Sequence, residues 1–228
     1  MRQFFFFLLI ISVLDAFAQQ IDVGLNRVYG KAIRQEQLMK AKVMDDLVAY
    51  FPHEWVEQYA GTSVKVDQAG KIRMAAGKND RFSPDQLRVL GTASVGDRIT
   101  VDVNYQRKNP VTGEPEKQSI SYAYTVVADQ EATYAIPQET FVKQFTAPLK
   151  SIFPEAKQGA SVAAKVRFVV LENGQIANVL LEQSSGSSAS DNHILETVRS
   201  MPKWKPAQNK DGRTFRQEFV LVVNNAGC

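Results

Sequence analysis

Residues that could do acid–base, nucleophilic or metal chemistry are sparse in this sequence, and their spacing fits no catalytic motif. His53 starts a stretch that reads like the His-Glu-x-x-His helix of zinc proteases, but Glu57 occupies the position of the second histidine. The other histidine, His193, is interpreted as a partly exposed packing residue on a short helix. Ser161 and Lys165 are four residues apart, whereas a Ser-x-x-Lys acylation site needs a spacing of three. We therefore predict that the protein is not an enzyme.

Motifs that bind cofactors are missing as well. The segment from Ser184 to Ser190 contains no Gly-x-Ser-x-Gly elbow, and the chain has neither a phosphate-binding Gly-Lys-Ser/Thr loop nor a dinucleotide fingerprint. Two histidines and one cysteine do not supply the ligands of a structural zinc site. For that cysteine, Cys228, we expect an exposed thiol, with an intermolecular disulfide as the alternative. The sequence thus predicts no cofactor, no metal and no small-molecule substrate.

Trp204 is flanked by Lys203 and Lys205, which suggests that its ring could stack on a ligand. However, Pro202 and Pro206 bracket the same segment, which joins a predicted helix to a predicted strand. A tryptophan in such a connection usually packs over a sheet, with its indole N–H on a backbone carbonyl. We therefore predict a structural role for Trp204.

A β-hairpin is predicted around an Asn-Gly pair, Asn173 and Gly174. Runs of β-branched residues flank this pair, and both central residues of a type I′ turn need the positive φ that Asn and Gly tolerate best. A Ser/Gly linker follows, and then a helix with one apolar face that starts from an N-cap at Ser190 or Asp191. The alternating run over residues 213–223 predicts a further strand. Together these elements predict an α+β fold in which a three-stranded antiparallel sheet carries a helix on one face.

The same features resemble the C-terminal domain of TonB, the periplasmic energy transducer, in the form seen in many Bacteroidota envelope proteins. The resemblance covers roughly the last third of the chain and assigns residues 136–228 to a TonB C-terminal-like domain. It implies a surface that binds a protein partner. The matching segments are Phe168-Val169-Val170 before Asn173-Gly174, Ser185-Gly186, Met201-Pro202-Lys203-Trp204-Lys205-Pro206 and the strand from Arg213 to Val223.

The last strand is the predicted partner-binding element. As the terminal strand of a small sheet it is expected at an edge, where its free backbone groups can pair with an extended peptide. By the resemblance, that peptide would be the TonB box of an outer-membrane transporter. The predicted partner-binding residues are Arg213, Phe215, Gln217, Phe219 and Leu221. Nearby basic residues are interpreted either as a solvated face or as a docking face for an acidic segment or an anionic polymer, and they include Lys203, Lys205, Lys210 and Arg216.

The N-terminus reads as an export signal. Arg2 precedes an apolar run over residues 4–14, and an Ala-x-Ala site ends at Ala18. Residues 1–18 are therefore predicted to be a secretory signal peptide, and the mature protein is expected in the periplasm. The alternative is an uncleaved inner-membrane anchor, although the run is short for a membrane span. The formal net charge of +3 does not indicate nucleic-acid binding.

Residues 19–135 are predicted to form a smaller α+β region. Its first part, residues 19–30, has no clear period and is expected to be a loose arm. Apolar residues at i, i+4 spacing predict an amphipathic helix over residues 32–51, whose apolar stripe forms core or a dimer interface. Alternating runs predict hairpins at about 62–76 and 98–127.

A capping box is predicted within this region. Ser83 is the N-cap, Pro84 takes the first helical position and Gln86 lies three residues after the cap. This part of the chain is similar to a segment often found before TonB-like domains in Bacteroidota proteins, which implies no activity.

The combined prediction is a non-enzymatic periplasmic TonB-like protein that binds a partner by edge-strand pairing and is linked to TonB-dependent transport across the outer membrane. The sequence has no Pro-rich spacer, and cleavage would remove the apolar run, so an adaptor, a competitor or a sensor is expected rather than a direct energy transducer. Two alternatives remain open. One is a structural envelope module that binds the cell wall or self-assembles as a homodimer, and the other is a true transducer with an uncleaved N-terminal anchor.

Overall fold

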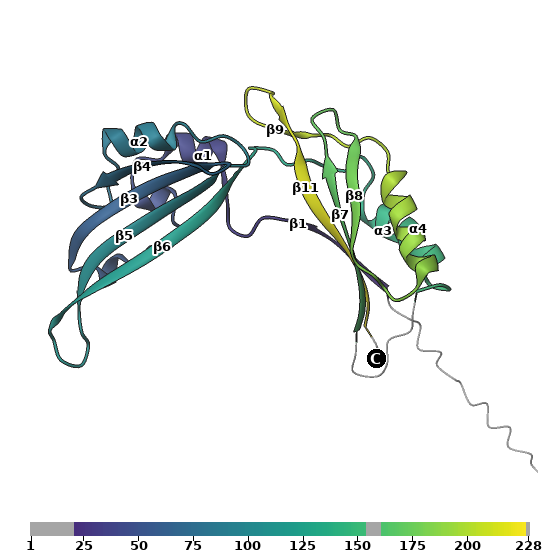
Figure 1. Cartoon of the computed structure of the whole chain (residues 1–228), viewed down its shortest axis with the longest axis horizontal. Helices are drawn as coiled ribbons and strands as arrows, with labels where there is room; N and C mark the ends of the chain where they lie inside the picture. The colour runs from purple at the N-terminus through teal and green to yellow at the C-terminus, as the bar shows by residue number, and fades with distance from the viewer. Residues whose placement is uncertain (1–20, 154–160, 227–228) are drawn as a thin grey trace, which may run out of the picture.

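The protein folds into two units that lie side by side and are joined at one end (Figure 1). The structure is a computed structural model that describes residues 21–153 and 161–226. The predicted signal peptide, residues 1–18, and Cys228 lie outside the described residues. Within the described ranges, no helix is long and apolar enough to cross a membrane.

The C-terminal unit is built on a four-stranded antiparallel sheet in the order β1-β11-β7-β8. Its strands are β1 (Ile21–Arg27), β7 (Ser161–Val170), β8 (Ile176–Gln183) and β11 (Gln217–Ala226). Three of these strands come from the C-terminal third of the chain, but the predicted three-stranded sheet is incomplete because β1 adds a fourth strand. The expectation of a loose arm over residues 19–30 is therefore wrong: residues 21–27 are a strand that reaches from the N-terminal unit into the C-terminal sheet (Figure 1).

Two helices, α3 (Gln138–Leu149) and α4 (Ser188–Arg199), cover one face of this sheet (Figure 1). The N-cap of α4 is Ser187, earlier than predicted, and its side chain accepts a hydrogen bond from the Ser190 backbone N–H. Asp191 instead holds the preceding linker, because its carboxylate accepts from the Ser184 hydroxyl at 2.5 Å and the Ser185 N–H at 2.8 Å. The core between helices and sheet contains Phe145, Leu149, Ala164, Val166, Phe168, Val170, Ile194, Val198, Trp204, Phe219, Leu221 and Val223.

The turn between β7 and β8 differs from the predicted type I′ turn. Gly174 has φ +81°, but Asn173 is not among the residues with positive φ. The Gly174 N–H donates to the Leu171 carbonyl and the Leu171 N–H donates to the Gln175 carbonyl, both at 2.8 Å. The connection is thus a three-residue loop that ends in a left-handed glycine, the other common way to close a hairpin.

The predicted final strand is divided in two. Residues 207–208 and 214–215 form a small ribbon, β9 (Ala207–Gln208) paired with β10 (Thr214–Phe215), and β11 starts only at Gln217. Arg213 therefore lies in the turn before β10 and not in the main sheet. This ribbon is the part of the C-terminal unit that reaches back towards the N-terminal unit.

The N-terminal unit contains a five-stranded sheet in the order β2-β6-β5-β3-β4. Two long hairpins supply four of its strands, and β2 pairs in parallel with β6. The elements of this unit are β2 (Ala32–Arg34), α1 (Gln35–Lys40), η1 (Met44–Asp46), η2 (His53–Trp55), β3 (Gln58–Gln68), β4 (Lys71–Gly77), α2 (Pro84–Leu90), β5 (Arg98–Lys108) and β6 (Pro115–Val127).

The helix predicted over residues 32–51 is not continuous. Those residues form β2, the short helix α1 and a 3-10 turn, because the backbone N–H of Met44 pairs with the Asp80 carbonyl rather than continuing a helix. Met44 and Val48 are both fully buried, so their apolar spacing reflects core filling by an irregular segment. The predicted capping box is present: the Ser83 side chain accepts from the Gln86 N–H and the Gln86 side chain accepts from the Ser83 N–H.

Candidate functional site

The predicted partner-binding strand does not lie at an edge of the sheet. β11 is paired on one side with β7 and on the other side with β1, in a continuous register from Ile21↔Asn225 to Arg27↔Phe219. The edge prediction is wrong because it assigned no strand to residues 21–27. The side of β11 that was predicted to bind a peptide is therefore occupied by an extended segment of the same chain.

The predicted partner-binding residues occupy three different environments. The side chains of Phe219 and Leu221 are buried in the core, so these residues can present only their backbone groups to a neighbouring strand. Phe215 is half-buried in β10, and the Arg213 guanidinium lies 5.3 Å from the centre of its ring. The structure therefore does not bring the five side chains together on one surface.

Gln217 is a clamp between segments that are far apart in the sequence. Its side-chain carbonyl accepts from the Ala132 N–H at 2.8 Å, and its amide donates to the Tyr29 hydroxyl at 3.0 Å. Burial, followed by the nearby Glu131 carboxylate, raises the pKa of Tyr29, which keeps that hydroxyl neutral. Gln217 thus ties the start of β11 to the connector between the units and to the segment after β1.

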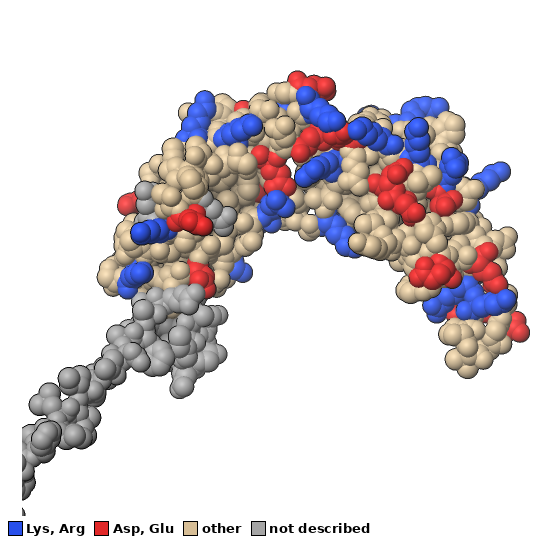
Figure 2. All heavy atoms as spheres, turned by 180° about the vertical axis from the view of Figure 1, so that it is seen from behind, with Lys and Arg blue, Asp and Glu red and all other residues tan. Residues whose placement is uncertain are grey.

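The predicted basic face is only partly free. Lys203, Lys205 and Arg216 are exposed, whereas the Lys210 ammonium pairs with the Glu36 carboxylate of the N-terminal unit. Figure 2 shows Lys and Arg side chains beside Asp and Glu side chains along the junction of the two units, rather than a continuous basic surface. Some of these basic side chains, such as Lys210, therefore form ion pairs within the molecule.

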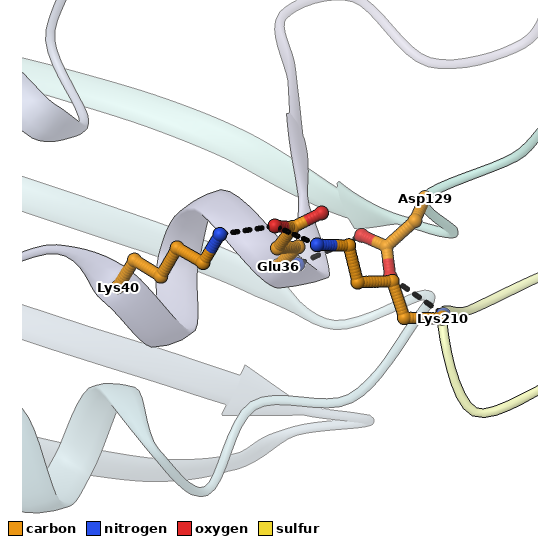
Figure 3. A network of polar contacts seen from close by, with 4 residues as sticks. All are labelled: Glu36, Lys40, Asp129 and Lys210. Carbon is orange, nitrogen blue, oxygen red and sulfur yellow. Dashed lines mark hydrogen bonds and ion pairs between the residues drawn. The ribbon is translucent and has the colours of Figure 1, made fainter.

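Glu36, Lys40, Asp129 and Lys210 form a polar latch where the two units meet (Figure 3). The Glu36 carboxylate accepts from the ammonium groups of both Lys40 and Lys210. The Asp129 carboxylate accepts from the backbone N–H groups of Glu36, at 2.8 Å, and of Lys210, at 3.0 Å. Asp129 thus bridges the start of α1 to the turn of the β9–β10 ribbon.

We expect Asp129→Ala to loosen the two units relative to each other, because two backbone N–H groups on opposite sides of the junction lose their shared acceptor. Small-angle X-ray scattering should show a larger maximum dimension than in the wild-type chain. Glu36→Gln is the control that keeps Asp129, and it should change the scattering curve little at neutral pH because exposed ion pairs contribute weakly. An unchanged curve for Asp129→Ala would contradict the bridging role.

The pH dependence of the latch has a definite sign. Hydrogen bonds from Lys210 and then Lys40 hold the pKa of the Glu36 carboxyl below its usual range. A carboxyl with a lowered pKa in the folded protein stabilises the structure at neutral pH and loses this contribution as the pH falls through the lowered pKa. Urea unfolding at pH 7 and at pH 3 should therefore show a small acid-induced loss of stability that is reduced in Glu36→Gln. The same loss in both proteins would assign it to another group.

Trp204 is buried, as predicted, with an exposed fraction of 3%. Its ring lies 5.1 Å from Phe219, 5.2 Å from Tyr134 and 5.8 Å from Phe168, measured between ring centres. The predicted hydrogen bond from the indole to a carbonyl is wrong, because the buried Nε1 atom has no acceptor among the described residues. The residue's own backbone N–H donates instead to the Gly174 carbonyl at 2.9 Å.

An apolar cavity of about 420 Å³ lies beside Trp204, under β1. Val23 and Leu25 of β1 form one wall, and residues before and within α3 form another. The volume is in the range of small-ligand pockets, and hydrophobic side chains dominate the lining. The remaining lining residues are Ala132, Thr133, Tyr134, Ile136, Pro137, Phe141, Val142, Met201 and Trp204.

The described residues that line the cavity include no His, Cys, Asp, Glu, Lys or Arg. His53 hydrogen-bonds to Asp45 at 2.6 Å on the surface of the N-terminal unit, away from the cavity. In the part of the chain that the structure describes, no group of three or more His, Cys, Asp or Glu residues could hold a metal ion. What the C-terminal unit offers is an extended strand-pairing surface with an apolar cavity beside it.

Sequence reasoning missed the residues that complete this surface. Ile21, Val23 and Leu25 alternate with Asp22, Gly24 and Asn26, so a period of two was present in residues 21–27. The signal was weak because it is short and contains a central glycine.

Part of the C-terminal unit is similar to a known family. Residues 154–223 match the family model of the Gram-negative bacterial TonB protein C-terminal. No curated protein and no solved structure matches the chain.

Proposed function

We propose that the TonB C-terminal domain in this chain binds an extended segment of a protein partner in the cell envelope, by strand pairing on its four-stranded sheet. TonB C-terminal domains are non-enzymatic interaction domains whose partners include outer-membrane transporters. The proposal places the protein in the periplasm, as an adaptor or a competitor at such transporters.

One observation carries this proposal: an extended segment of the chain already lies along β11 in antiparallel register over seven residues. The backbone groups on that side of β11 can therefore pair with an extended strand, and in this structure β1 occupies them. Backbone pairing supplies affinity that depends little on sequence, and side chains at alternate positions add specificity.

The opposite edge of the sheet is less suited to the same task. The pairing of β7 with β8 has two register irregularities, and Asn178 in β8 has φ +51°. Bulges twist an edge strand and interrupt its row of free backbone groups, which is a common protection against added strands. The β11 side is therefore the better candidate for binding a partner.

The proposal is tested with a purified TonB-dependent outer-membrane transporter in detergent and with the same transporter lacking its periplasmic N-terminal segment. We expect the full chain, immobilised on a biosensor, to bind the first and not the second. Equal binding to both would contradict strand pairing with that segment. Binding to purified cell-wall sacculi without binding to either transporter would support the alternative of a structural envelope module.

A further inference from the structure

The side chains of β1 follow a pattern that can be read as a binding motif. Ile21 is buried in the core of the C-terminal unit, Val23 packs against that core, and both Val23 and Leu25 line the cavity. These three residues lie opposite Asn225, Val223 and Leu221 of β11. Alternate residues of β1 thus face the helices, while the residues between them, Asp22, Gly24 and Asn26, face the other way.

β1 fits this place poorly. Of its three inward-facing side chains only Ile21 is buried, and Leu25 keeps 39% of its surface exposed. Gly24, in the middle of the strand, adds no side-chain contact and makes the extended conformation costlier to form. Val23 and Leu25 also leave the cavity of about 420 Å³ beside them unfilled. This pocket is partly open to solvent, so its apolar walls remain in contact with water and β1 leaves their burial incomplete.

We infer that β1 is an internal stand-in for the partner, and that the partner's extended segment replaces it on β11. This inference rests on the proposed function and adds to it the chemistry of the segment. The segment is a strand with apolar side chains at three alternate positions, and the side chain opposite Val223 is bulkier than Val23. Such a residue enters the cavity that β1 leaves empty.

The residues that line the cavity favour a large, mainly apolar side chain on the partner's segment. Phe141, Met201 and Trp204 provide broad apolar walls, and Tyr134 stands between them. Trp204, whose buried indole N–H has no acceptor among the described residues, is one of the residues that line the cavity. An aromatic or long aliphatic residue would bury this surface, and apolar burial is the term that favours one strand over another when backbone pairing is equal.

Replacement explains the structure better than addition of the partner to the outer edge of β1. A strand added outside β1 would leave the cavity empty and would gain nothing from its apolar walls. Departure of β1 also leaves the other sheet intact. Among the described strands β1 pairs only with β11, and it joins β2 through residues 28–31. The short tether holds β1 near β11 at an effective concentration of the order of millimolar, so the partner must bind more tightly than β1 does.

A disulfide that fixes β1 to β11 tests this directly. Val23 and Val223 are cross-strand neighbours, so Val23→Cys with Val223→Cys places two thiols at a distance suitable for a disulfide. Cys228→Ser is added in every protein so that no other thiol competes. The control combines Val223→Cys with Ala164→Cys, which joins β11 to β7 and leaves β1 free. The probe is a fluorescein-labelled synthetic peptide of the β1 sequence, Ile21–Arg27, that carries Val23→Phe.

We call the Val23→Cys/Val223→Cys protein the β1 lock and the Ala164→Cys/Val223→Cys protein the β7 control. We expect the oxidised β1 lock to show no peptide binding by fluorescence anisotropy. The reduced β1 lock and the β7 control should both bind the peptide. Val23→Asn in the chain should raise the peptide affinity about tenfold, the factor that corresponds to losing the burial of one valine. A peptide with Val23→Asn is the matched control and should bind least. Urea unfolding of each protein checks that the C-terminal unit remains folded.

Each other result overturns the inference. Equal binding by the locked and reduced proteins would place the peptide elsewhere, for example on the outer edge of β1, while transporter binding could still hold. Loss of binding in the β7 control would assign the effect to stiffening of β11. No binding by any protein would show that β11 does not accept a strand with this pattern of side chains. Light scattering that shows a dimer instead of a peptide complex would mean that the segment paired with β11 comes from a second copy of the chain. The transporter experiment is separate, so the failure of one proposal is distinguishable from the failure of the other.

Discussion

Trp204→Ala is expected to destabilise the C-terminal unit by about 3–5 kcal/mol, the range for removing a fully buried large aromatic side chain. The ring packs within 6 Å of three other aromatic rings, those of Phe168, Phe219 and Tyr134, which belong to two strands of the sheet and to the connector. Its loss would also enlarge the existing cavity, and the cost of such a substitution rises with the volume of the cavity that remains.

The measurement is urea unfolding followed by far-ultraviolet circular dichroism, because the substitution removes a fluorescent reporter. Trp55→Ala is the control: that side chain is half exposed in the N-terminal unit, and surface substitutions usually change stability by less than about 0.5 kcal/mol. Trp204→Phe should be milder than Trp204→Ala, because it keeps an aromatic ring and removes an N–H that has no acceptor among the described residues. A Trp204→Ala protein as stable as the wild type would disprove the core role.

Local patterns explain most of what could be predicted in the two units. The β-branched runs around Asn173 and Gly174 specify β7 and β8, because the strand preference and the turn residues agree over a few adjacent positions. Capping by Ser83 and Gln86 was equally readable, since both partners lie within one turn of the helix they start. These features depend on neighbours in the sequence.

The pairing of β1 with β11 could not be read in the same way. It joins Ile21 to Asn225 across almost the whole chain, and nothing near either residue specifies its partner. Without β1, β11 appeared to be an edge strand, and the predicted binding surface was left open. The same limit applies to the Lys210 side chain, which seemed free beside its neighbours but pairs with Glu36 of the other unit.

Gly174→Ala is expected to cost at least about 3 kcal/mol, through two effects that act at one residue. A Cβ atom at this position would lie 2.1 Å from the Trp204 carbonyl oxygen, and the φ of +81° is unfavourable for any residue with a side chain. Relief of the contact would separate the hairpin turn from the Trp204 segment and break the hydrogen bond from the Trp204 N–H to the Gly174 carbonyl.

Gly212→Ala separates these two effects. Gly212 has φ +78°, nearly the value at Gly174, but a Cβ atom there would meet nothing within 4 Å. Its substitution should therefore cost only the backbone term, about 1 kcal/mol, in the same urea unfolding experiment. The difference between the two variants measures the steric contact between the turn and the Trp204 carbonyl. Equal losses would mean that the turn can move away from Trp204 freely, and that the hairpin does not hold the tryptophan segment over the sheet.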